Sequence, residues 1–180
     1  ATVNPAANAG LVEGMKGLFN PTDTISRQFK NGMMGEGVLG FEEINMSQSI
    51  SQHTTGTTPT APIVAATVTA EGSTSLAISF SSGSPTFRIG DVFTIANVYA
   101  VNPQTRQSTG SLQQFVVTAD LTISSTTTGT LTVSPAMYTS ANALATINAF
   151  PVSGAALTFL GRSATQYPQN LIYHKDAITF

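Results

Sequence analysis

The sequence predicts a mainly β protein, made of one small β-barrel or sandwich and a smaller α+β part. From residue 63 to residue 160, apolar side chains alternate with small or polar ones at a period of two, as in strands with one buried face. Clusters of Gly, Pro, Asp and Ser interrupt this run at short intervals, as turns do. In residues 1–31 the apolar positions instead recur at helical spacing.

Two helices are predicted in the N-terminal part, over residues 5–17 and 21–31. Each begins at an Asn-Pro pair, Asn4-Pro5 and Asn20-Pro21. Asn caps free backbone N–H groups, and Pro suits the first helical position.

The segments beyond these helices are predicted from alternation and turn composition. Residues 38–46 are typical of an extended strand, and the Thr-, Gly- and Pro-rich residues 47–62 of a linker. Residues 164–170 are again polar, and residues 171–180 predict a final strand. A barrel would suit the run between them, because closure removes exposed sheet edges. Within that run, strands are expected at 64–68, 76–80, 92–99, 115–117, 121–123, 131–133 and 157–160.

Composition limits the function classes. Only 9% of the residues are charged, against about 25% in an ordinary soluble domain. A weakly charged surface suits a protein that packs against its own kind, although a β domain with a Ser/Thr surface would look the same. The seven Lys and Arg residues form no basic run, so no specific nucleic acid is expected as a partner. No apolar run could span a bilayer, the N-terminus is not a signal peptide, and cysteine is absent.

No catalytic residue, cofactor-binding residue or metal ligand is predicted. Residues 35–40 match a G-x-G-x-x-G pattern but have no preceding strand, so a turn is the simpler interpretation. His174 and Asp176 are interpreted as a structural or surface pair, because no nucleophile elbow accompanies them. His53 stands alone in the linker, and the adjacent Glu42-Glu43 would point to opposite faces of a strand.

Three stretches carry a resemblance. They run from Gly17-Leu18-Phe19-Asn20-Pro21 to Gly40-Phe41, from Gly90-Asp91-Val92-Phe93 through Asn102-Pro103 to Val116-Val117-Thr118-Ala119, and from Gln169-Asn170-Leu171 to His174-Lys175-Asp176-Ala177. In these stretches, which span most of the sequence, the chain resembles the major coat (capsid) proteins of short-tailed double-stranded DNA phages. Their capsid fold is shared by tailed phages and herpesviruses.

The resemblance implies a central domain, surrounding the capsomer axis, that is interrupted by an inserted β-barrel. Residues 1–58 and 164–180 would be two pieces of an incomplete central domain, and residues 59–163 the insertion. The resemblance also implies a fragment, since the long spine helix, the extended arm and the peripheral strands of a whole coat protein are missing. Such a fragment is not expected to form shells alone.

The implied function is structural and not enzymatic. Subunits would self-assemble into an icosahedral shell enclosing DNA, in the host cytoplasm, and remain in the virion capsid. The implied partners are other copies of the full-length protein, a scaffolding protein and a portal protein, with no membrane. The alternative is a Ser/Thr-rich β adhesin or carbohydrate-binding surface module, which usually presents exposed aromatics; the absence of Trp counts against it.

One segment, residues 102–111, is a candidate for contact between subunits. Asn102-Pro103 starts a turn, Arg106 is its only charged residue, and Gly110 permits an unusual backbone angle. The candidate inter-subunit residues are therefore Asn102, Pro103, Arg106 and Gly110. The alternative is an ordinary mobile hairpin loop.

Overall fold

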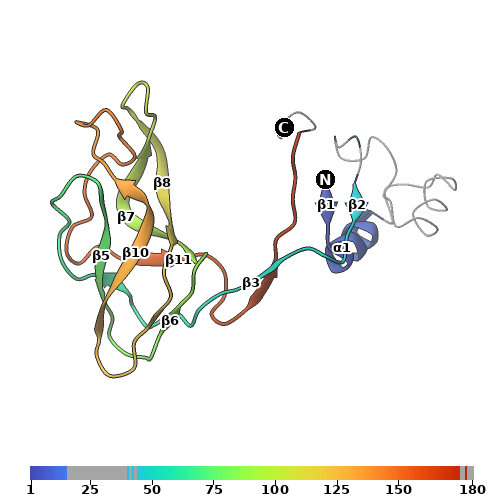
Figure 1. Ribbon diagram of the computed structural model, residues 1–180, viewed down its shortest axis with the longest axis horizontal. Helices are drawn as coiled ribbons and strands as arrows, with labels where there is room; N and C mark the ends of the chain where they lie inside the picture. The colour runs from blue at the N-terminus through green and yellow to red at the C-terminus, as the bar shows by residue number, and fades with distance from the viewer. Residues whose placement is uncertain (16–39, 41, 43, 175–176, 178–180) are drawn as a thin grey trace, which may run out of the picture. The chain divides into compact units, whose positions relative to one another are not determined.

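The computed structural model describes residues 1–15, 40, 42, 44–174 and 177. The chain divides into two compact units. Unit 1 comprises Ala1–His53 with Tyr167–Phe180, and unit 2 comprises Thr54–Gln166 (Figure 1).

Unit 1 is a small α+β assembly. Strand β1 (Thr2–Val3) runs parallel to β2 (Asn45–Met46), and helix α1 (Pro5–Met15) follows β1 directly. The helix begins at the predicted residue, where the Ala7 N–H donates to Asn4 Oδ1 over 2.9 Å. The second predicted helix, 21–31, lies outside the described residues. The hydrophobic core of this unit consists of Val3 and Ile44, and it packs against Ala1, Ala7, Leu11 and Val12.

Unit 2 is a barrel-like sheet, as predicted. Its six strands lie in the order β11-β7-β8-β10-β5-β4. A bridge between Ile63 and Ala156 joins the two ends of this order, and the Val64 N–H donates to the Ala155 carbonyl over 2.9 Å. The sheet therefore closes on itself, which pairs strands that would otherwise be edges. The strands are β4 (Ile63–Val64), β5 (Ser73–Ser79), β7 (Val92–Val101), β8 (Ser108–Val117), β10 (Thr128–Met137) and β11 (Leu157–Phe159).

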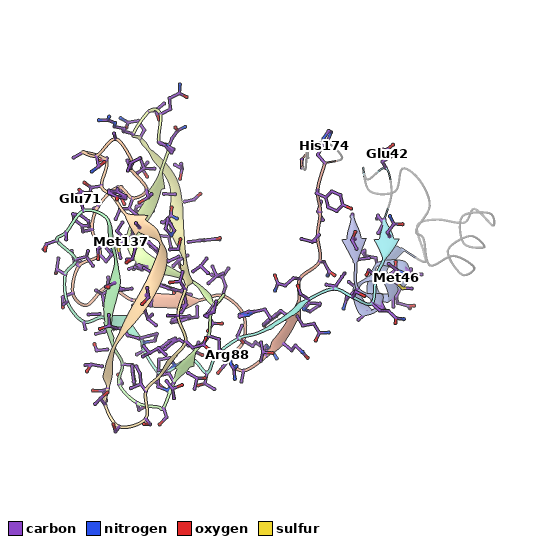
Figure 2. The ribbon with its side chains drawn as sticks, in the orientation of Figure 1. Glu42, Met46, Glu71, Arg88, Met137 and His174 are labelled. Carbon is purple, nitrogen blue, oxygen red and sulfur yellow. The ribbon has the colours of Figure 1, made fainter. Side chains whose placement is uncertain are left out.

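Aromatic rings fill the barrel. Phe93 lies between two partners, with ring centroids 5.8 Å from Phe115 and 5.2 Å from Phe159. Phe87 packs on Phe159 at 5.3 Å, and Met137 is fully buried inside the barrel (Figure 2). The inward residues are the apolar members of the period-two pattern, so the alternation in the sequence reflects one buried face on each strand.

Two short ladders complete the fold. Strand β6 (Thr86–Phe87) pairs with β9 (Leu121–Thr122), and β3 (Gln52–Thr54) pairs with β12 (Gln166–Pro168). The boundary between the two units falls within β3 and β12. Both of these strands lie in segments that the sequence predicted to be polar and without regular structure.

Other predicted strands differ from the structure. The strand expected at 64–68 ends at Val64, since the Val68 N–H bonds to the Pro151 carbonyl in a loop. In the described part of the expected strand 171–180, Leu171 alone forms a bridge, with Thr2. The prediction of a strand at 38–46 holds for Asn45–Met46, among the described residues.

Candidate functional site

The predicted contact segment is the tip of the β7–β8 hairpin, which projects beyond the strands of the barrel (Figure 1). Asn102 organises the tip: its Oδ1 accepts the N–H groups of Gln104 at 2.9 Å and Thr105 at 3.4 Å. Its carbonyl accepts the Arg106 N–H at 2.8 Å, and its own N–H donates to the Gln107 carbonyl at 3.0 Å. These bonds close the turn without help from another element.

The four predicted residues lie together on this exposed tip. Asn102, Pro103 and Arg106 are in the turn, and Arg106 has a left-handed backbone with a φ of 57°. Gly110 lies on β8, with a φ of 78° and no atom near the position of a Cβ. The glycine is therefore required by its backbone angle and not by crowding.

The hairpin changes register twice. Thr94 pairs with Gln114, Tyr99 with Leu112, and Val101 with Ser108. The first shift places extra residues on β7, around Asn97 with its φ of 64°, and the second places extra residues on β8, around Gly110. Bulges bend a strand and increase its twist, so they set the direction in which the tip projects.

A neighbouring loop supports one side of the hairpin. The Tyr99 N–H donates to Asn148 Oδ1 at 2.7 Å, and the Asn148 N–H donates back to the Tyr99 carbonyl at 3.0 Å. The Val101 N–H donates to the Thr146 carbonyl at 3.3 Å, and Ala100 bridges Ile147. The β7 side of the hairpin is thus covered.

Asp91 is a buried polar residue of unit 2 that the sequence analysis missed. It is 5% exposed, and its carboxylate accepts the Arg88 N–H at 2.8 Å and the Gly56 N–H at 3.1 and 3.3 Å. A Cβ on Gly56 would lie 1.8 Å from the Thr86 carbonyl oxygen. The carboxylate therefore fixes the segment that enters the barrel onto the turn before β7, which is a structural role. The sequence indicates a turn at Gly90-Asp91, but it does not indicate that Asp91 contacts Gly56.

The residues considered for chemistry lie only partly within the described part of the chain. His53 is half-buried and His174 is exposed, both in unit 1. Glu42 is exposed, whereas Glu43, Asp176 and most of residues 35–40 lie outside the described residues. Among the residues that the structure describes, no three His, Asp or Glu side chains come together as metal ligands. Within the same residues, no helix is long and apolar enough to cross a membrane.

Comparison with known proteins gives a family match and matches among solved structures. A family model described as "P22 coat protein - gene protein 5" matches residues 2–180. A solved structure described as "CUS-3 coat protein I-domain" is similar at 27% sequence identity, with 57% of this chain and 97% of that chain covered and a TM-score of 0.41. No curated protein matches.

Proposed function

The chain belongs to the P22 coat protein family, and on this premise we propose how its parts serve a phage capsid. The family is structural, so the protein is a capsid subunit that assembles with other coat subunits in the virion. The match over residues 2–180 is the observation that carries this conclusion. Nothing in the comparisons supports the adhesin alternative.

We assign unit 2 as the inserted barrel domain and unit 1 as part of the central domain that surrounds the capsomer axis. The predicted domains were 1–58 with 164–180, and 59–163. The division of the chain into Ala1–His53 with Tyr167–Phe180 and Thr54–Gln166 supports this assignment. Closure of the barrel by Ile63 and Ala156 also supports it, since a closed sheet needs no neighbouring domain to cover its edges.

We further propose that the hairpin tip contacts a neighbouring subunit, through Asn102, Pro103, Arg106 and Gly110. The internal bonds of Asn102 support this role, because a turn that is already ordered loses little entropy when it binds. Arg106 is the one charged residue of residues 102–111, and it is exposed in the turn at the end of the hairpin. An acidic group on the neighbouring subunit would complement it.

The remaining partners follow from the same proposal. Assembly takes place in the host cytoplasm with a scaffolding protein and a portal protein, and yields an icosahedral shell that encloses DNA. The protein has no catalytic role in this scheme. Individually weak contacts between identical subunits become stable together when the shell closes.

Co-expression of the full-length protein with its scaffolding protein tests the proposal. Electron microscopy should show closed shells, and their absence would contradict the capsid role. Arg106→Glu should lower the yield of shells while the circular dichroism of the subunit stays unchanged. Arg88→Glu, also exposed and in unit 2, is the matched charge reversal. Equal yields from the two variants would refute the tip contact.

A further inference from the structure

The β8 side of the projecting hairpin is a sheet edge. β10 pairs with β8 through Val133–Val117 and Ser134–Val116. The register between the two strands ends at Ser134, and Ala136, the next β10 residue whose backbone would face β8, has its carbonyl bonded to Thr146 Oγ1 over 2.8 Å instead. Among the described residues, the part of β8 from Ser108 to Phe115 has β7 as its only strand partner.

The edge turns the backbone groups of Gln114 outward. In β7 the even-numbered residues face β11, since the Leu160 N–H donates to the Val92 carbonyl and the Ala96 N–H donates to the Ala156 carbonyl. Thr94, between them, therefore turns its backbone groups away from its pair partner Gln114. The two members of such a pair point their N–H and C=O groups in opposite directions, so those of Gln114 face outward.

The same reasoning places the backbone of Leu112 outward. Its pair partner Tyr99 bonds through both N–H and C=O to Asn148, on the far side of β7. Gln113, between Leu112 and Gln114, then faces β7. The open edge thus offers the N–H and C=O groups of residues 112 and 114.

The edge lacks the usual protection against pairing. Strand β8 contains no charged residue, whereas natural edge strands commonly carry Lys, Pro or inward-pointing charges. Its outer face exposes 39% of Leu112 and 36% of Val116, on either side of Gln114. A weak cover comes from the strand itself, because Gln113 Nε2 donates to the Gln114 carbonyl at 2.8 Å. Rotation of the Gln113 side chain would release that carbonyl.

We propose that this edge pairs antiparallel with the same edge of a second copy of the chain, centred on Gln113. The inference rests on the proposed assembly of coat subunits. Around this centre, Leu112 faces Gln114 of the second copy and Gln114 faces its Leu112, which gives about four backbone hydrogen bonds. A pairing centred on Gln114 would place Leu112 opposite Val116 of the second copy, but the backbone of Val116 is already paired with Ser134. A pairing centred on Leu112 would place Gln114 opposite Gly110, which lies in the bulge.

A second copy is the occupant that the edge fits. An isologous twofold contact requires one surface to be complementary to itself. An edge without charges meets this condition, because no like charges face one another across the axis. Two short strands bury much less than the roughly 1,200 Å² of a stable interface, so the contact is expected in assembled shells and not between free subunits.

Disulfide formation in shells of the full-length protein tests the pairing. The centre places the two copies of residue 113 opposite each other as a non-hydrogen-bonded pair, about 4.5 Å apart at Cα, within the range of a disulfide. The 180 residues contain no cysteine. Gln113→Cys should shift oxidised subunits in shells to dimer mobility. The control Thr130→Cys, exposed on β10 and paired with Ala77, should not.

Introducing a charge at residue 113 gives a second test of the pairing. Gln113→Lys alone and Gln113→Glu alone should each lower the yield of shells, and mixing the two variants should restore it. Shells of Gln113→Cys without dimers, or no rescue on mixing, would overturn the edge pairing. If Arg106→Glu still lowers the yield in that case, the tip contact stands without it. Absence of shells from the unsubstituted protein would overturn both proposals.

Discussion

Replacing Asp91 should destabilise unit 2 more than any other single exchange of a carboxylate there. The Asp91 carboxylate is 5% exposed and accepts two backbone N–H groups, those of Arg88 and Gly56. Hydrogen bonds to a charged group contribute about 1.5–3 kcal/mol each. Asp91→Ala removes both and leaves the buried Gly56 N–H without this acceptor, so the free energy of unfolding should fall by about 3–6 kcal/mol.

Asp120 provides a matched control for this exchange. It serves the same turn, since its Oδ1 accepts the Ile89 N–H at 2.7 Å, but it is exposed. Asp120→Ala should therefore cost about 0.5–1.5 kcal/mol, and Asp91→Asn should fall between the two alanine variants. Urea unfolding of the 180-residue chain, followed by far-ultraviolet circular dichroism, measures the difference. Equal midpoints for Asp91→Ala and Asp120→Ala would refute the role given to the buried carboxylate.

Two further pairs of exchanges test the packing of the barrel by the same measurement. Gly56→Ala should lower the free energy of unfolding by at least about 2 kcal/mol, because the new Cβ would meet the Thr86 carbonyl oxygen. Gly110→Ala should lower it by only about 1 kcal/mol, through backbone strain, because the space around Gly110 is open. The reverse order would contradict the contact at Gly56. Phe115→Ala should cost about 3–5 kcal/mol by opening a cavity beside Phe93, and Val116→Ala, on the outer face of the same strand, about 0.5 kcal/mol. Similar losses for both would mean that β8 does not bury the face described.

The sequence predicted β7 and β11 because the alternation in these strands has a direct physical cause, whereas it predicted only short parts of β8 and β10. Residues 92–99 form most of β7, and residues 157–160 include β11. In both, the inward positions are filled by apolar side chains, as with Phe93 and Ile95. The candidate tip was also visible, since Asn102-Pro103 is a turn signal and the structure closes that turn on Asn102.

What the sequence could not predict depends on contacts between distant residues. Strands β3 and β12 are joined through backbone groups, so neither needs an alternating pattern of side chains. Asp91 reaches Gly56, 35 residues earlier, and neither residue type signals the other. The strand expected at 64–68 looked regular, but Val68 bonds to the loop at Pro151 instead of to a strand.

Closure of the barrel also explains how a chain with only 9% charged residues protects its strands. Natural sheets usually discourage pairing with charges at their edges, and β8 has none. In unit 2 the bridge of Ile63 with Ala156 removes edges by topology instead, so charge is not needed where the sheet is closed. That protection stops at Ser134 and Val116, the last pair of β10 with β8 toward the hairpin tip. The exposed edge at Leu112 and Gln114 therefore lies where neither closure nor charge prevents a second strand from binding, which is why a contact between subunits is expected there.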